Sequence, residues 1–281
     1  MFDTHCHLNF KAFKNVVDDV IVSAKNAGVS YFVVPGTDIK TSEQAVSIAS
    51  EYECVYAAVG IHPHHIYEYQ TKKDESQDYE KNIENDLNII SKLLINKKVV
   101  AVGEVGVDKY YYRDTKYSTY HINDAFIKLQ IIALESQIKL ALEHDKSLIL
   151  HNRLASDLLF ETLTKIWDDK LKKRTVIHCC EAEDRLLDFA IAKGTYIGVD
   201  GDVTFSKPKQ QFIKKVPLNL LVVETDSPFI VPEPLKSQNK RPNTPANLHL
   251  IVKEVSRLKN ETVEKIIKET TTNGKELSRI T

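Results

Sequence analysis

Eight short apolar runs alternate with longer amphipathic segments along almost the whole chain, and this alternation limits the possible folds more than any other feature. We expect the apolar runs to be β-strands over Met1–His7, Tyr31–Gly36, Val55–Gly60, Val99–Glu104, Ser147–His151, Arg174–His178, Thr195–Val199 and Leu220–Asp226. Helical periodicity is found over Val16–Ala27, Thr41–Tyr52, Glu80–Asn96, Asn123–His144, Ala155–Asp169, Glu183–Lys193, Pro208–Lys215, Ala246–Leu258 and Thr262–Leu277. Strands separated by helices pair in parallel, because parallel neighbours need a crossover connection.

Two architectures accommodate such a chain, namely a closed α/β barrel and a doubly wound open sheet. The expected strands are continuously apolar, as is typical of strands buried on both faces. An open sheet would gather its ligands at one switch point, whereas the candidate site residues here belong to five different strands. We therefore predict a TIM-type (β/α)8 barrel of the amidohydrolase-like kind, formed by residues 1–281 as one domain.

Composition is ordinary for a globular protein, with 42% hydrophobic and 27% charged residues among 281. No apolar run approaches the ~18 residues that cross a bilayer, and the four cysteines show no disulfide spacing. We expect a cytoplasmic protein without a membrane or obligate protein partner, and a monomer. The net charge of −1 means that any nucleic acid must be held by local contacts rather than by a basic surface.

Histidines and acids stand at or near the ends of five expected strands. Side chains alternate in a strand, so His5 and His7 should share one face, about 6–7 Å apart. The other candidates follow later runs: Glu104, His151, His178 and Asp226. Because a parallel barrel collects strand-end side chains at one mouth, the sequence predicts a metal-dependent enzyme.

The six candidate metal ligands are too many for one four-coordinate ion. Two-metal sites with ions about 3.5–4 Å apart serve hydrolysis, and Glu104 stands between the two groups of ligands in chain order. We therefore predict two divalent ions, of zinc, manganese, cobalt or magnesium, with Glu104 as bridge and catalytic group. Asp226 is expected to ligate one ion and to orient or deprotonate the attacking water, with Glu224 as a supporting partner behind the ligands.

Other polar residues at the expected mouth are interpreted as substrate contacts. His62 and His64 lie on a turn fixed by Pro63, and Arg153 offers a bidentate fork for an oxyanion. Three segments outside the repeat should form loops at this end, and the first is polar and acidic enough to lie on the surface. They are Tyr67–Tyr79, Tyr110–His121 and the five-proline stretch Pro228–Pro245.

The chain resembles the TatD family of metal-dependent hydrolases. The resemblance rests on Phe2-Asp-Thr-His-Cys-His-Leu8, Val59-Gly-Ile-His-Pro-His64, Val102-Gly-Glu-Val-Gly-Val-Asp108, His151-Asn-Arg153, Ile177-His-Cys179, Val223-Glu-Thr-Asp-Ser-Pro228 and Thr271-Thr-Asn273, in family order. It implies a TIM-type barrel, divalent metals held by the same six ligands, and deoxyribonuclease activity, usually as a 3′–5′ exonuclease. DNA or an oligonucleotide is then the expected substrate.

Four positions depart from the family pattern: Cys180, Glu181, Asp200 and Asp202. The three acids should repel phosphates at the mouth, whereas His62, His64, Arg153, Lys207 and Lys209 should contact them. Two alternatives stay open. The same metals polarise a carbonyl, so the substrate could be a small amide, ester or lactone. The barrel could also be a non-enzymatic metal-binding protein, although six buried polar groups around one cavity argue for catalysis.

Overall fold

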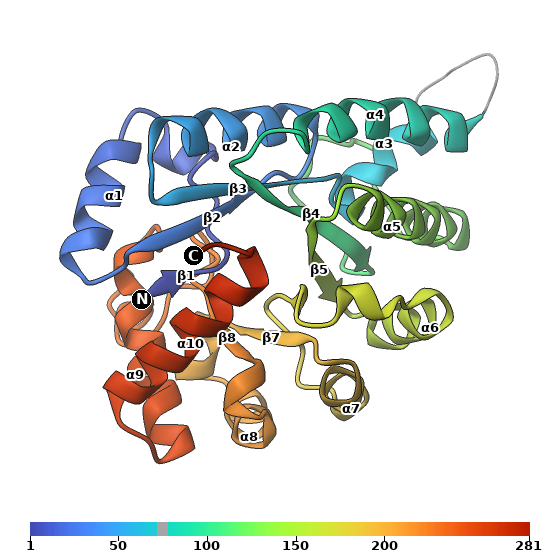
Figure 1. Ribbon diagram of the computed structural model, residues 1–281. Helices are drawn as coiled ribbons and strands as arrows, with labels where there is room; N and C mark the ends of the chain where they lie inside the picture. The colour runs from blue at the N-terminus through green and yellow to red at the C-terminus, as the bar shows by residue number, and fades with distance from the viewer. Residues whose placement is uncertain (72–77) are drawn as a thin grey trace.

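Eight parallel strands form one sheet whose spatial order follows the sequence (Figure 1). The computed structural model describes residues 1–71 and 78–281. The strands are β1 (Phe2–Asp3), β2 (Tyr31–Pro35), β3 (Val55–Val59), β4 (Val99–Asp108), β5 (Ser147–Arg153), β6 (Thr175–Ile177), β7 (Tyr196–Val199) and β8 (Leu221–Val223). Each strand pairs in parallel with the next along the chain.

The first and last strands meet at a seam that closes the sheet into a ring. An isolated parallel bridge joins Cys6 to Ser227. The backbone N–H of Thr4 donates to the carbonyl oxygen of Val223 at 3.2 Å, and that of Asp226 donates to His5 at 2.9 Å. The predicted TIM-type barrel is therefore confirmed, and the doubly wound sheet is excluded.

The helices lie around the outside of the strands (Figure 1). They are α1 (Val17–Asn26), α2 (Ile39–Glu51), α3 (Tyr67–Thr71), α4 (Tyr79–Leu93), α5 (Asp124–Glu143), α6 (Ser156–Ile166), α7 (Asp184–Lys193), α8 (Lys207–Lys215), α9 (Leu248–Lys259) and α10 (Val263–Ser278). Short 3-10 turns include η2 (Pro63–Ile66) and η4 (Gly201–Thr204). Most of the apolar core lies between the strands and these helices.

A second apolar cluster fills the ring with one or more side chains from each strand: Phe2, Val33, Ala58, Val100, Ala101, Ile149, Val176, Tyr196 and Val222. Leu277 of α10 joins this cluster, so α10 packs against the ring as well as against α9. A Cβ at Gly274 would lie 2.8 Å from the Phe2 ring, which is why α10 carries glycine at this contact. Asn273 Nδ2 donates to the carbonyl oxygens of Leu218 and Leu221, tying α10 to the start of β8.

Several strand bounds differ from those predicted. The first strand ends at Asp3, so His5 and His7 lie beyond it and strand alternation does not set their spacing. Strand β4 continues through Asp108 and β5 through Arg153, so Glu104 and His151 lie within strands rather than at strand ends. That part of the prediction is wrong because mutual pairing between β4 and β5 extends both strands beyond their apolar runs.

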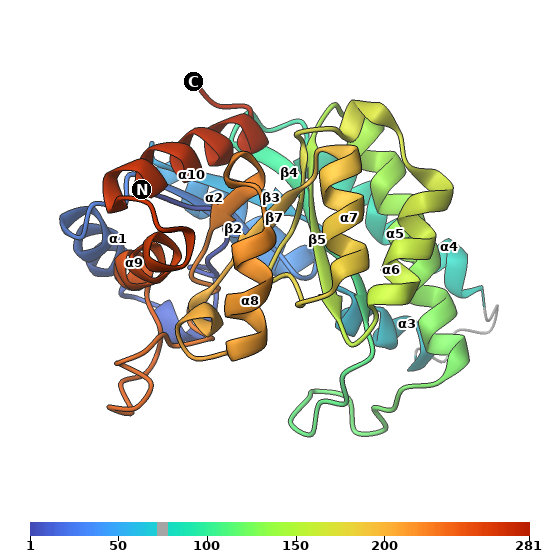
Figure 2. The same cartoon turned by 90° about the horizontal axis from the view of Figure 1, so that it is seen from below.

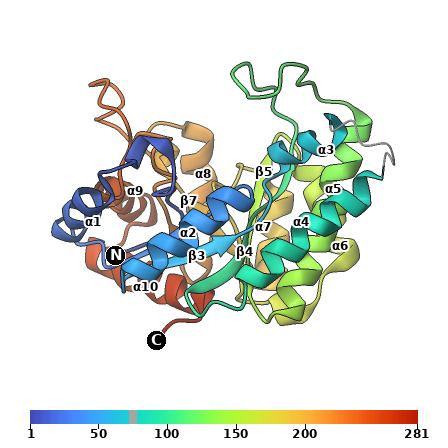
Figure 3. The ribbon, with the colours of Figure 1, turned by 90° about the horizontal axis from the view of Figure 1, so that it is seen from above.

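The loops after β4 and β8 project from the same end of the barrel, and the C-terminus lies at the opposite end (Figures 2 and 3). The predicted surface segment Tyr67–Tyr79 is only partly described, since 72–77 lie outside the described residues. Within it, α3 is helical, and Tyr67 and Tyr69 are buried, so the prediction is wrong for this part. Among the described residues, no helix is both long and apolar enough to span a bilayer.

Candidate metal centre

The carboxylate of Glu104 lies at the centre of a buried cluster of imidazoles. Its Oε2 lies 3.4 Å from His5 Nε2 and 3.7 Å from His7 Nε2. Its Oε1 lies 2.6 Å from His151 Nδ1 and 2.8 Å from His178 Nε2. Each carboxylate oxygen therefore faces its own pair of histidines, although these come from three separate parts of the chain: the segment after β1, strand β5 and the residue after β6.

Strand pairing determines where Glu104 and His151 meet. Gly106 of β4 is in register with His151 of β5. A Cβ at Gly106 would lie 1.9 Å from the carbonyl oxygen of His151, so only glycine permits this close approach. The glycine two residues after Glu104 therefore brings the two side chains together.

His5 and His7 are held by contacts across the seam. Asp3 is buried, and its carboxylate accepts hydrogen bonds from the N–H groups of His5 and Thr225 and from the Thr225 hydroxyl. The N–H of His7 donates to the carbonyl oxygen of Ser227 at 2.7 Å. The two imidazole rings have centroids 4.9 Å apart, closer than an extended strand would place them.

Asp226 completes this side of the cluster. It follows β8 in a left-handed conformation with φ of 46°, which turns its side chain away from the strand direction. Its Oδ1 lies 3.4 Å from His7 Nε2 and 3.8 Å from His5 Nε2, and the residue is 8% exposed. All six predicted ligands are therefore brought together at one buried place.

Glu224 lies behind His178, where the sequence predicts a supporting carboxylate. Its Oε1 accepts a hydrogen bond from the N–H of Cys179 at 2.6 Å and lies 3.6 Å from His178 Nδ1. Thr4 Oγ1 donates to the other oxygen at 3.3 Å. This carboxylate can orient the His178 ring, because a ligating histidine usually directs its second nitrogen at such a group.

Asp108 has a matching place behind His151, and sequence reasoning assigned it no role. Its Oδ2 lies 3.1 Å from His151 Nε2 and accepts a hydrogen bond from the Tyr112 hydroxyl at 2.7 Å. The residue is fully buried, and Gln130 holds its backbone N–H and carbonyl oxygen. The signal was available: an interval of four residues in a strand puts Asp108 on the same face as Glu104.

We expect Asp108→Asn to weaken metal binding or activity by about 10- to 100-fold, the usual cost of losing a carboxylate behind a ligating histidine. The amide cannot accept the His151 N–H as strongly, so the ring loses its fixed orientation. Metal titration of the purified variant measures the change. Asp114→Asn, an exposed acid of the same loop, is the matched control. Equal metal affinity in Asp108→Asn and the control would show that Asp108 does not orient His151.

His62 lies closer to the ligands than its predicted role as a substrate contact requires. Its Nε2 is 3.4 Å from Glu104 Oε1, and its ring centroid is 4.3 Å from that of His151. His64 lies farther out, with its Nε2 3.0 Å from Thr115 Oγ1 and its ring against Tyr112 and Tyr120. Both side chains line the pocket above the cluster.

Arg153 is exposed at the rim of that pocket and is held by aromatic rings. Its guanidinium carbon lies 3.7 Å from the centroid of Tyr110, and its Nη1 donates to the Tyr112 hydroxyl at 3.2 Å. Stacking leaves the guanidinium edge free for a bidentate contact with an oxyanion. The predicted loop Tyr110–His121 therefore supplies the support for Arg153.

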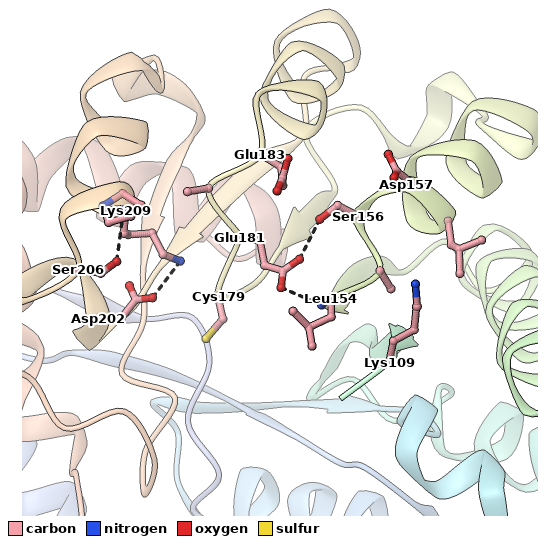
Figure 4. Close-up of a pocket in the computed structure, with 14 residues that line it drawn as sticks. Lys109, Leu154, Ser156, Asp157, Cys179, Glu181, Glu183, Asp202, Ser206 and Lys209 are labelled. Atoms are coloured by element: carbon pink, nitrogen blue, oxygen red, sulfur yellow. Dashed lines mark hydrogen bonds and ion pairs between the residues drawn. The ribbon is translucent and has the colours of Figure 1, made fainter. Parts of the chain in front are cut away.

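The cluster opens into a pocket of about 610 Å³, and a second pocket of about 620 Å³ adjoins it (Figure 4). The two share Cys179, Glu181 and Asp202. In Figure 4 the Glu181 carboxylate points at the start of α6. It accepts hydrogen bonds from Leu154 N at 2.8 Å, Asn152 Nδ2 at 2.7 Å and Ser156 Oγ at 2.8 Å.

The structure bears on two expectations about charge at the mouth. Glu181 uses both oxygens in hydrogen bonds inside the protein but keeps its charge, so its repulsion of a phosphate stays a prediction. Lys209 is buried, with 4% of its surface exposed. Its Nζ donates to the carbonyl oxygen of Cys180 and lies 3.4 Å from Asp202 Oδ2. The predicted contact of Lys209 with a phosphate is therefore wrong. Its charge offsets the neighbouring acids Asp200 and Asp202. Lys207 is exposed, and its contact stays a prediction.

The charge states of the cluster follow from burial and from its own members. Burial would raise the pKa of Glu104, but the charges of His178 and His62 outweigh it and hold that pKa well below its usual range. Burial lowers the pKa of His5 and of His62. Burial also lowers the pKa of His151, but hydrogen bonds to Asp108 and Glu104 outweigh it and raise it to about 9.

The donor set fits divalent cations. His5 Nε2 and His7 Nε2 face each other at 3.2 Å, and so do His151 Nδ1 and His178 Nε2. Only one of two facing imidazole nitrogens can donate, so a cation beside each pair would accept both lone pairs. Among the described residues, four groups place three ligand atoms each within 4.8 Å: His5–His178–Glu224, His5–His7–Glu104, His62–Glu104–His151 and His178–Cys179–Asp226.

Comparison with known proteins agrees with this geometry. The profile of the family described as TatD related DNase matches residues 2–279. The chain is 30% identical to a protein of Bacillus subtilis named uncharacterized metal-dependent hydrolase YabD, covering 100% of this chain and 99% of that protein. It is 28% identical to the Escherichia coli protein named 3'-5' ssDNA/RNA exonuclease TatD, over 99% of this chain and 98% of that one. The crystal structure of the TatD homologue YjjV from Escherichia coli superposes with a TM-score of 0.83 at 26% identity, covering 100% and 98% of the two chains.

Proposed function

The chain belongs to the TatD-related DNase family of metal-dependent hydrolases, and from this we propose that it cleaves phosphodiester bonds of single-stranded nucleic acid, releasing nucleotides from the 3′ end. Two divalent ions per chain are part of the proposal, with His5, His7, Glu104, His151, His178 and Asp226 as their ligands. The family match favours this reaction over the hydrolysis of a small amide, ester or lactone and over a barrel without catalysis.

One observation carries the proposal of two ions. The two oxygens of Glu104 face separate pairs of imidazoles, His5 with His7 and His151 with His178. A carboxylate with this arrangement is suited to bridge two cations, since each oxygen already belongs to a different donor group. A single ion would use only one of these groups and leave the other nitrogens facing each other.

Each residue then has a part in hydrolysis. Two bound ions would supply an activated water and stabilise the leaving oxygen. Asp226 lies beside His7 at the pocket floor, where its carboxylate can orient the attacking water and take a proton from it. Arg153 at the rim can bind a phosphate oxygen pair through its guanidinium edge. His64, whose pKa burial lowers to about 4, would meet the substrate as a neutral hydrogen-bonding ring.

The proposal is tested with purified protein, a 5′-labelled single-stranded oligonucleotide and each of manganese, zinc, cobalt and magnesium. We expect stepwise shortening from the 3′ end, loss of cleavage with a chelator, and recovery when the metal is returned. An ester and lactone panel is run in parallel. Hydrolysis of a panel member far faster than any oligonucleotide, or cleavage that survives the chelator, would contradict the proposal.

Metal uptake should release protons. The pKa of His151 in the metal-free protein is about 9, and that of His178 lies well above its usual range because the charge of Glu104 outweighs burial. Below these values both rings are protonated, so an ion must displace a proton from each. Metal affinity should therefore rise with pH towards 9 and fall on acidification. This pH range lies above the pKa of ~6.5 of a free imidazole. Calorimetric titrations at pH 7 in two buffers of different ionisation enthalpy measure the release, and equal heats in both would contradict it.

Four statements from the sequence stay predictions: the cytoplasmic location, the monomeric state, the lack of an obligate protein partner and the single domain over residues 1–281. The metal identity also stays open among zinc, manganese, cobalt and magnesium. Imidazole-rich ligation favours the first three over magnesium.

A further inference from the structure

Two aromatic side chains, Phe10 and Phe229, line the metal pocket without joining the apolar core. The ring of Phe10 stacks on His7, with centroids 4.2 Å apart and an interplanar angle of 20°. The ring of Phe229 lies edge-on to both, at 6.0 Å from Phe10 and 6.0 Å from His7. The three rings form a corner that we call the Phe corner, and one of them is the proposed metal ligand His7.

Phe229 is 50% exposed, yet its backbone is fixed. Its N–H donates to the carbonyl oxygen of Asp226 at 2.9 Å. Asn243 is fully buried and clamps both flanks: its N–H donates to Pro228 at 3.0 Å, and its Nδ2 donates to Ile230 at 3.1 Å. The flanking backbone is therefore held in place while the aromatic ring above it stays uncovered.

The position of this ring predicts what covers it. A phosphodiester bound at the imidazole pairs would bring its flanking bases into the pocket that Phe10 and Phe229 line beside His7. Arg153 lines the same pocket, stacks on Tyr110 and is suited to the phosphate backbone, so the exposed ring of Phe229 is available to a base. Aromatic side chains stack with any base, because every base has a π face.

We propose that Phe10 and Phe229 form a stacking subsite for the nucleobase next to the scissile phosphodiester. The proposal rests on the proposed nuclease function and deepens it. The subsite would hold any of the four bases, and an abasic sugar–phosphate would bind poorly at that position. Phe229 supplies the exposed ring on which the base would stack. Phe10 stacks on His7 and supports the ring of Phe229 from the side.

The test uses 5′-labelled single-stranded oligonucleotides that carry one abasic tetrahydrofuran residue at the 3′-terminal, the penultimate or a mid-strand position. For the unmodified protein we expect kcat/KM to fall on the order of 10-fold for the terminal or the penultimate abasic site, relative to the mid-strand one. In Phe229→Ala this ratio should approach 1, and Phe229→Tyr should restore it. Phe205→Ala is the matched control, since Phe205 is 37% exposed and is covered by Lys236 outside the pocket.

A binding measurement without turnover gives a second readout. Oligonucleotides with 2-aminopurine at the 3′-terminal or at the penultimate position are titrated with protein in a chelator, and the fluorescence of one of them should be quenched when the base stacks. Quenching should be lost in Phe229→Ala and kept in Phe205→Ala. If Phe229→Ala keeps both the abasic ratio and the quenching, the stacking subsite is wrong. If the unmodified protein cleaves no oligonucleotide but binds and quenches, the nuclease proposal fails while the subsite stands.

Discussion

Glu104→Ala is expected to lower kcat on a single-stranded oligonucleotide by at least about 10³-fold. In other enzymes, removal of one hydrogen-bond donor to the transition state lowers kcat by about 10²- to 10³-fold. The loss should be larger than for any other single ligand, because the carboxylate of Glu104 faces one imidazole pair with each of its two oxygens. Without the carboxylate, two sets of imidazoles remain with no anion between them. Metal content should fall from two ions per chain towards one or none.

Two measurements check this expectation on one preparation, namely elemental analysis after dialysis and the rate of oligonucleotide shortening. Glu84→Gln removes an exposed acid on α4 and should leave both values unchanged. Thermal unfolding of Glu104→Ala without metal confirms that the fold is intact. A folded variant that holds two ions and cleaves at a near-normal rate would show that Glu104 does not bridge the ions.

Asp226→Asn is expected to lower kcat by about 10²- to 10⁴-fold, the range for loss of a positioned proton acceptor. The amide keeps the size and the backbone contacts of the aspartate, including the hydrogen bond from Asp226 N to His5 O. It cannot take a proton from the attacking water. KM should change little, because the substrate contacts at the rim are untouched.

The contrast with Glu104→Ala lies in the metal content. Asp226→Asn removes a ligand charge at one edge of the cluster, so most of the metal should remain while turnover is lost. Asp188→Asn, on the exposed side of α7, is the matched control. Loss of both ions together with activity would show that Asp226 acts mainly as a ligand and has no separate part in proton transfer.

The order of the strands and the convergence of the ligands could be predicted because both follow from periodic patterns. Apolar runs separated by amphipathic helices determine a parallel arrangement, and a closed ring brings one end of every strand to one mouth. His178 follows β6 directly, and Asp226 stands three residues after β8, which ends at Val223 and not at Asp226 as predicted. The pattern therefore identified the six proposed ligands without knowledge of their distances, although it missed Asp108 behind His151.

The predictions that were wrong concern features that depend on contacts between distant segments of the chain. The extension of β4 past Glu104 requires the partner strand β5 and the close approach at Gly106. Lys209 follows Lys207 and a proline, so it resembles a surface residue in sequence, yet it is buried by the β6 and β7 loops that meet around it. Pairing partners and loop contacts of this kind leave no periodic signal in either segment alone.

The seam between β1 and β8 has a consequence for the synthesis and the degradation of the protein. His5 and His7 come from the first residues of the chain, and Asp226 is supplied only after more than two hundred others have been added. The nascent chain therefore cannot assemble the whole ligand set until the last strand leaves the ribosome, so hydrolytic competence begins only with a closed ring. An ion held across the seam would favour the closed form by mass action. A protease that cuts between the two ends and frees either one would also disassemble the metal centre, so no nuclease fragment would be left behind.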